Sequence, residues 1–184
     1  MIGLLGGAFD PPHDGHVALV RGAREQLGLD DVLVVVAAHP GHKQVDTPPA
    51  IRLELARAAF PGEPLVLDAH ARTVDMLRDH PQWQGATFLL GADEYAGFSR
   101  WKEPEEVLRL VRVAVGTRPG FSLPAAEEDG RVTFFEIDPV PVSSSELRKR
   151  LDRGEDVSGL VPAAVWRLIE RDGLYGRGGY TEPS

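Results

Sequence analysis

Residues 2–16 carry the sequence IGLLGGAFDPPHDGH, and this stretch decides the fold class. Its first four residues are mostly apolar and stop at Gly6-Gly7, which is typical of a short buried strand that runs into a loop. A segment with helical spacing, Val17–Leu27, follows and ends before Gly28. The chain therefore opens with a strand, a glycine-rich loop and a helix.

The same alternation of strand and helix continues along the chain. Val32–Ala37 is rich in β-branched residues, as expected of a strand that is buried on both faces of a parallel sheet. Further strands are expected at 65–67, 87–90, 111–115 and 132–137, and further helices at 51–60, 74–80, 104–110 and near 144–152 and 162–171. This alternation predicts one α/β domain over residues 1–175, with a mainly parallel sheet flanked by helices. Residues 176–184 are expected to form a flexible tail.

Composition and charge narrow the class of protein. The chain has 184 residues, which is enough for about one domain. Its 20 Lys and Arg against 28 Asp and Glu give a net charge of -8, which argues against binding duplex DNA or an anionic membrane through a basic surface. The absence of cysteine excludes disulfides and thiolate chemistry. Because the sequence shows neither a long apolar run nor a basic leader, we expect a cytoplasmic protein.

The loop over residues 6–16 has the chemistry of a phosphate site. Gly6 and Gly7 let the backbone approach a phosphate closely, and the following helix points its free N–H groups at the same place. His13 and His16 are spaced so that both can donate to phosphate oxygens. The loop is neither a Walker loop nor a G-x-G-x-x-G dinucleotide fingerprint. Alternatively, the histidines could hold a metal ion, although no third ligand is evident nearby, or lie unused on a surface turn.

Two other loops add cationic and hydroxyl groups. The run Ser143-Ser144-Ser145-Glu146 has the pattern of a capping box at a helix start, and Arg148 lies one turn into that helix. A helix start with extra hydroxyls and an arginine is also a good polyphosphate site. His42 and Lys43 lie in the loop after the second expected strand, where a lysine either serves a phosphate or is a solvated surface residue.

Together these motifs resemble the α/β nucleotidyltransferases that attack ATP at its α-phosphate. Residues 6–16 match every fixed position of the family's GG-x-F-D-P-x-H-x-G-H signature. Further segments are similar to the bacterial nicotinate-nucleotide adenylyltransferases. These segments are Thr73 to Leu77, Leu90 to Asp93 with Trp101, Arg118 to Gly120, and Val161 to Tyr175. The Ser-Tyr pair that precedes the threonine in this family is Ala71-Arg72 here, and the family's Asn-Pro in the loop at 38–43 is altered.

The resemblance implies a Rossmann-like fold and a reaction. ATP, with Mg²⁺ carried on its phosphates and not in a protein cage, would react with nicotinate mononucleotide to give deamido-NAD and pyrophosphate. The implied catalytic residues are His13, His16, Lys43 and Arg148. The implied ATP-binding residues are Gly6, Gly7, Phe9, His13, His16, Ser143, Ser144, Ser145 and Arg148. The implied mononucleotide-binding residues are His42, Lys43, Thr73, Asp93, Trp101 and Arg118.

Several alternatives stay open at this point. The acceptor could be nicotinamide mononucleotide or phosphopantetheine, and the protein could be a nucleotide-binding regulator without turnover. A nucleic-acid-binding module is discouraged by the negative charge, no membrane partner is expected, and the oligomeric state is undetermined. Trp101 could be a rim aromatic without a ligand, and Asp93 or Thr73 could cap a helix. His70 and His80 match no motif, and we expect both at the surface.

Overall fold

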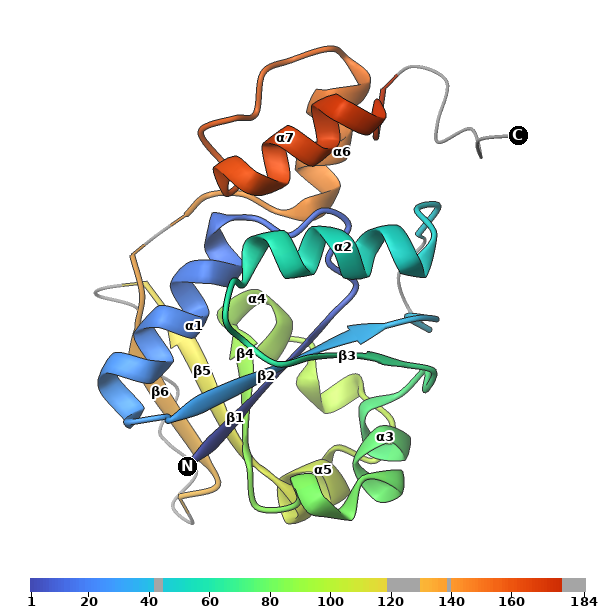
Figure 1. Ribbon diagram of the computed structural model, residues 1–184. Coiled ribbons are helices and arrows are strands. Elements are labelled where there is room, and N and C mark those ends of the chain that lie inside the picture. Colours follow the sequence, from blue (N-terminus) through green and yellow to red (C-terminus); the bar gives the residue numbers. More distant parts are fainter. Residues whose placement is uncertain (42–44, 119–129, 139, 177–184) are drawn as a thin grey trace.

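The computed structural model describes residues 1–41, 45–118, 130–138 and 140–176. Its centre is one six-stranded sheet in the order β3-β2-β1-β4-β5-β6 (Figure 1). The strands are β1 (Ile2–Gly7), β2 (Asp31–Ala37), β3 (Leu65–Asp68), β4 (Thr87–Gly91), β5 (Arg112–Thr117) and β6 (Val132–Glu136). All five neighbouring pairs are parallel, so the predicted α/β class with a parallel sheet is confirmed.

Helices cover both faces of this sheet, because alternate side chains of the strands enter two separate cores. The helices are α1 (Asp14–Leu27), α2 (Pro49–Ala59), α3 (Thr73–Asp79), α4 (Ala92–Tyr95), α5 (Pro104–Leu110), α6 (Ser144–Asp152) and α7 (Ala163–Asp172), with 3-10 turns η1 (Pro81–Trp83) and η2 (Phe98–Arg100). Leu5 and Val34 enter the core shared with α1, α2, α6 and α7. Leu4 and Val35 enter the core shared with α3 and α5. Burial on both faces explains the continuous apolar run of β2.

The differences from the predicted elements have local causes. Helix α1 begins at Asp14, three residues before the predicted start, because its first turn carries no large apolar side chain to reveal the helical period. Helix α4 was not predicted, since four residues are too few to show a period. Helix α5 has the predicted bounds, because Pro104 at its first position and acids in its first turn mark the start.

The division of the chain into a domain over 1–175 and a tail over 176–184 stays a prediction, since residues 177–184 lie outside the described residues. No helix in the described part of the chain is long and apolar enough to cross a membrane.

The strand order places a topological switch point between β1 and β4. Strand β1 pairs with β2 on one side and with β4 on the other. After β3 the chain therefore crosses back over the sheet, and β4, β5 and β6 are added on the opposite side of β1. The loops that follow these two strands diverge, and a ligand site in an open α/β sheet lies in the space between them. The loops after β1 and β4 are therefore the first places to look for chemistry.

Candidate active site

The loop after β1 brings two imidazole rings together at the start of α1. His13 is the N-cap of α1 and His16 lies in its first turn. The centres of the two rings are 3.8 Å apart. A side chain at position 15 would place its Cβ 3.0 Å from His13 Nδ1, so Gly15 leaves the room in which the His13 ring lies over the helix start.

The proton on His16 can be assigned from its hydrogen bond. The backbone N–H of His13 donates to His16 Nδ1 over 3.2 Å. An N–H group donates only, so Nδ1 accepts and the proton of the neutral ring lies on Nε2. His16 therefore offers an N–H donor at the N-terminus of α1, where the backbone N–H of Asp14 donates to Leu160 and those of His16 and Val17 donate to the carbonyl of His13. Donors gathered at a helix N-terminus favour a phosphate oxygen.

The Ser-rich turn docks directly on this loop. Ser144 Oγ donates to the carbonyl of Pro11 over 2.8 Å. Arg148 Nη1 donates to the carbonyl of Asp10 over 2.6 Å, and Arg148 Nη2 lies 3.4 Å from Ser145 Oγ. The start of α6 and the glycine loop are far apart in the sequence, and the bonds to Pro11 and Asp10 make them one surface. The predicted ATP-binding motifs thus lie together at the carboxyl edge.

Only one of the two hydrogen bonds of the predicted capping box forms at the start of α6. The hydroxyl of Ser143 accepts the backbone N–H of Glu146, so Ser143 is the N-cap. The carboxylate of Glu146 instead accepts from Arg150 Nε over 3.0 Å. The capping box is therefore half formed, because an arginine one turn later competes for the glutamate.

A buried carboxylate supports the loop from behind. The side chain of Asp10 is 2% exposed, and its Oδ1 accepts from the Tyr175 hydroxyl over 2.8 Å. Asp10 Oδ2 lies 3.7 Å from Arg148 Nη1. Burial, and then the charge of Asp10, raise the pKa of the Tyr175 phenol, so this hydroxyl stays a donor at neutral pH. Tyr175 follows α7, near the end of the described chain. Its hydrogen bond to Asp10 therefore links that end to the loop after β1.

A buried arginine joins the loop after β1 to the connection between β2 and α2, beneath the site. Arg52 of α2 is 1% exposed, and its guanidinium donates four hydrogen bonds to backbone carbonyls. The acceptors are Ala8 (2.8 Å), Ala37 (2.7 Å), Ala38 (2.9 Å) and Thr47 (3.0 Å). Burial lowers the pKa of this guanidinium, and Asp10 and Tyr175 act in the opposite direction. An arginine still keeps its charge, so a fixed positive charge lies under the glycine loop.

A cavity of about 450 Å³ opens beside Arg52. It is lined by residues 38–41 and 45–49, by Arg52 and by Ala71. That volume is within the range of small-molecule sites. His42 and Lys43, which were predicted to serve the mononucleotide and the reacting phosphates, lie outside the described residues.

The other predicted mononucleotide residues follow the ends of β3, β4 and β5. Thr73 begins α3, Asp93 lies in α4, Arg118 directly follows β5, and Trp101 follows η2. The Trp101 ring is half-buried and packs at 5.2 Å, between ring centres, against Phe98. That Trp101 meets a pyridine ring stays a prediction.

The helix-cap alternatives for Asp93 and Thr73 are both wrong. The N-cap of α4 is Gly91, and the N-cap of α3 is Arg72.

The segment that carries Trp101 is braced against α3. Lys102 Nζ donates to both carboxylate oxygens of Asp75, over 2.7 and 3.0 Å. Arg78 of the same helix pairs with Glu103. These ion pairs hold the Trp101 segment against α3, the helix that begins at Thr73. Two of the predicted mononucleotide residues, Trp101 and Thr73, therefore lie on segments that are linked to each other.

Comparison with known proteins identifies the family of this chain. Residues 4–150 match the cytidylyltransferase-like family model. A relative from Bordetella avium, named a probable nicotinate-nucleotide adenylyltransferase, is 39% identical and is aligned over 95% of this chain and 97% of its own length. One of the same name from Thermus thermophilus is also 39% identical, over 95% and 98%. This chain belongs to the nicotinate-nucleotide adenylyltransferase family.

Solved structures support the fold of this family member. The nicotinic acid mononucleotide adenylyltransferase of Plasmodium falciparum, complexed with NaAD, superposes with a TM-score of 0.73 and covers 95% of this chain and 96% of its own. Its sequence is 18% identical, so the likeness concerns the fold. The same enzyme complexed with APC superposes with a TM-score of 0.70. The Rossmann-like architecture predicted from the resemblance is confirmed.

Three features of this adenylyltransferase family member differ from the sequence-based expectation. Arg52 was missed, although one signal was present: it shares the apolar stripe of α2 with Leu55 and Ala56, where a charge is unexpected. Phe9, a predicted ATP contact, is 1% exposed and packs edge-on against His16, so its ring supports the histidine from the core. His70 and His80 were expected at the surface, and both are half-buried.

Proposed function

We propose that this protein transfers the adenylyl group of ATP to nicotinate mononucleotide, forming deamido-NAD and pyrophosphate in NAD biosynthesis. A phosphate oxygen of the mononucleotide attacks the α-phosphorus of ATP in line, and the bond from that phosphorus to the bridging oxygen of the β-phosphate breaks. A phosphate monoester is already a competent nucleophile at neutral pH, so the reaction needs neither a general base nor a covalent enzyme intermediate. Catalysis then consists of positioning and of charge stabilisation.

The observation that carries this proposal is the junction of the two phosphate motifs. Arg148 and Ser144 bond the backbone of the loop that carries His13 and His16, at 2.6 and 2.8 Å, which supports a single ligand shared by the guanidinium, the hydroxyls and the imidazoles. A triphosphate is the ligand that needs donors at several points along its length. Membership of the adenylyltransferase family supports the same conclusion.

Each group in the site has a role under this proposal. His16 would donate its Nε2 proton to an oxygen of the α-phosphoryl group as charge builds up there, with His13 beside it. Arg148 and the Ser143 to Ser145 turn would hold the β- and γ-phosphates. Lys43 and His42, from the loop after β2, would neutralise charge where the two substrates meet.

The mononucleotide would lie on the β4 side of the switch point between β1 and β4. Trp101 would face the pyridine ring, and Thr73, Asp93 and Arg118 would hold the ribose and phosphate. The cavity beside Arg52 lies next to the loop that carries His42 and Lys43, which supports placing the reacting phosphates near that arginine. Lys102 and Arg78 act on this half as positioning residues, because they hold the Trp101 segment on α3.

We further propose that Mg²⁺ accompanies ATP, bound to its phosphates and water, as is common for this ion. It would lower the negative charge on the triphosphate. The residues here fit a metal carried on the substrate: the described residues of the glycine loop and the start of α6 offer hydroxyls, imidazoles and a guanidinium, and their one buried carboxylate, Asp10, is engaged by Tyr175. A cytoplasmic location, and the absence of nucleic-acid and membrane partners, stay predictions.

The first experiment follows pyrophosphate release from ATP and Mg²⁺ with three acceptors in parallel: nicotinate mononucleotide, nicotinamide mononucleotide and phosphopantetheine. We expect fast release with the nicotinate compound. Fast release only with another acceptor would keep the chemistry and overturn the substrate. ATP binding without release from any acceptor would favour the nucleotide-binding regulator.

A further inference from the structure

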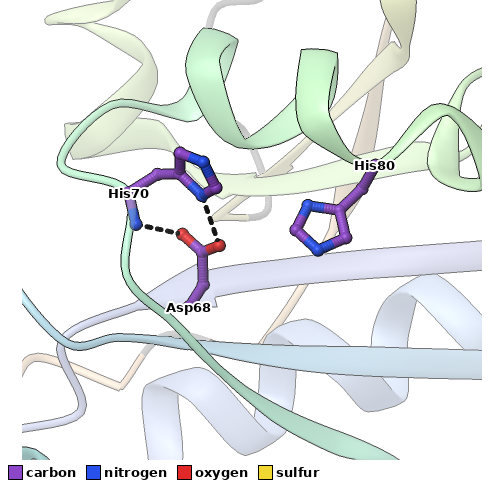
Figure 2. Close-up of side chains that lie close together, drawn as sticks. All are labelled: Asp68, His70 and His80. Carbon is purple, nitrogen blue, oxygen red and sulfur yellow. Dashed lines mark hydrogen bonds and ion pairs between the residues drawn. The ribbon is translucent and has the colours of Figure 1, made fainter.

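A second group of polar side chains lies at the carboxyl end of β3, away from the glycine loop. Asp68 is the last residue of β3, His70 follows it, and His80 ends α3 (Figure 2). One potential ligand atom from each of the three lies within 4.8 Å of the other two. This is the one group of three or more metal-ligating side chains found in residues 1–41, 45–118, 130–138 and 140–176. Strand β3 is separated from β1 by β2, so the cluster is distinct from the site proposed for ATP.

His80 is held in the form in which a histidine binds a metal. Its Nδ1 lies 2.9 Å from the carbonyl oxygen of Met76. A carbonyl oxygen only accepts, so Nδ1 carries the proton and Nε2 of the neutral ring has a free lone pair. Metal-binding histidines commonly donate their second N–H to a backbone carbonyl in this way. The ring also stacks on Trp83, with 3.9 Å between ring centres and 5° between planes, which restricts its rotation.

His70 lies between two carboxylates. Its Nδ1 is 2.7 Å from Asp68 Oδ1, and its Nε2 is 2.9 Å from Asp79 Oδ2. The backbone N–H of His70 also donates to Asp68 Oδ2. Hydrogen bonds to the two carboxylates, Asp68 first, raise the pKa of this imidazole. Asp68 is 6% exposed, so its charge is largely removed from water and depends on a cationic neighbour.

We propose that Asp68, His70 and His80 form a binding site for a divalent transition-metal ion, with Zn²⁺ as the expected occupant. Two imidazoles and one carboxylate are a ligand set that suits Zn²⁺. The ion takes the place of the proton that Asp68 and His70 share, so binding releases one proton from a protonated His70. His70 then binds the ion through Nδ1 and donates its Nε2 proton to Asp79, and His80 binds through Nε2. Water completes the coordination.

The distances require only local movement. Zinc–nitrogen bonds are about 2.0–2.1 Å long, so ligand atoms around a tetrahedral ion are about 3.4 Å apart. The pair at 2.7 Å must separate and the more distant atoms must approach. The side chain of His70 is 26% exposed and that of Asp79 is 69% exposed, so both can rotate toward solvent. The ion would join the turn after β3 to the end of α3 and so stabilise the segment that begins at Thr73.

The test uses the full chain without an affinity tag and after treatment with a chelator. Titration with Co²⁺, which reports its geometry by visible absorption, should saturate at one ion per chain with the strong bands of a tetrahedral site, and Zn²⁺ should displace it with a Kd below about 1 µM. His80→Gln and His70→Gln should each weaken binding about 100-fold or more, since even loss of an outer partner costs 10–100-fold. His39→Gln, which removes an exposed histidine outside the cluster, is the matched control and should bind normally.

Other outcomes overturn the proposal. Wild-type protein that shows no saturable binding, or a Co²⁺ spectrum without tetrahedral bands, excludes this site. Unchanged binding in both His70→Gln and His80→Gln, with circular dichroism showing folded protein, does the same. If His13→Gln abolishes binding, the ion lies at the other histidine pair instead. None of these results depends on turnover of ATP, so failure here is distinguishable from failure of the proposed reaction.

Discussion

In the described part of the chain, two pairs of neighbouring histidines lie in opposite surroundings. His13 and His16 lie at a helix N-terminus, beside Arg148 and above the buried Arg52. His70 and His80 lie beside carboxylates, at the end of a strand and a helix. An imidazole can donate to an anion or give its lone pair to a cation, so its neighbours decide which ligand it serves. The comparison teaches that the identity of a residue pair says less about function than the charges around it.

The largest expected effect is on stability. It concerns Arg52, the buried cation beneath the loop that carries His13 and His16. Arg52→Met should lower the free energy of unfolding by about 3 kcal/mol, because it leaves four carbonyls, two buried and two partly buried, without this donor. Urea unfolding measures this loss. Arg57→Met on the exposed side of the same helix is the matched control and should change stability by less than about 0.5 kcal/mol. Equal losses in the two variants would contradict a special role for Arg52.

The next prediction tests whether the reaction depends on the pair at the start of α1 and not on the pair beside Asp68. His16→Ala should lower kcat about 100-fold or more with little change in KM, because its donor acts on charge that develops in the transition state. His80→Gln, assayed without zinc, should keep kcat within about threefold. Pyrophosphate release measures both. Loss of turnover in His80→Gln and not in His16→Ala would reverse the assignment of the two pairs.

The hydrogen bond from Tyr175 to Asp10, which supports the loop of His13 and His16, makes the stability of the protein depend on pH. Tyr175→Phe should cost about 1.5 kcal/mol near neutral pH, because buried Asp10 loses a hydrogen bond. The folded state raises the pKa of Tyr175, whereas an unfolded tyrosine ionises near pH 10. The wild type therefore loses stability as the pH rises above about 10, and the phenylalanine variant is spared this loss. The difference between them should shrink from neutral to alkaline pH, and a difference that grows would contradict the burial of Tyr175.

The smallest effect concerns the geometry of the first pair. Gly15→Ala would bring a Cβ to 3.0 Å from His13 Nδ1 and displace the ring by a few tenths of an ångström. We expect kcat to fall about threefold to tenfold, since small misplacements in a reacting site are costly. Stability should change little. Gly159→Ala, where no heavy atom lies within 4 Å of the added Cβ, is the control and should show full activity.

These regions also show what the sequence could and could not predict. Strand β2 and helix α5 were predictable because burial on both faces and an N-terminal proline leave local marks. The glycine loop and the Ser-rich turn were predictable as motifs because their chemistry depends on a few adjacent residues. Their contact was expected only through resemblance, because no local pattern encodes a bond between Arg148 and Asp10.

The features that escaped prediction are contacts between distant segments. The acceptors of Arg52 are backbone carbonyls, which every residue possesses, so no side-chain pattern identifies them. Likewise His80 is ten positions beyond His70 and twelve beyond Asp68, and only the packing of α3 against the sheet brings it to these two neighbours. A cluster assembled by packing has no signature in the order of its residues.

The bonds of Asp10 have a consequence for the order in which the protein is made. Its partners Arg148 and Tyr175 lie 138 and 165 residues further along the chain. During synthesis from the N-terminus, strands β1 to β4 leave the ribosome well before either partner is available. Contacts of such long sequence separation also form late because closing the loop costs entropy. The contacts of Asp10 are thus completed late, and a nascent chain has the first four strands of its sheet before it has the groups that fix its nucleotide loop.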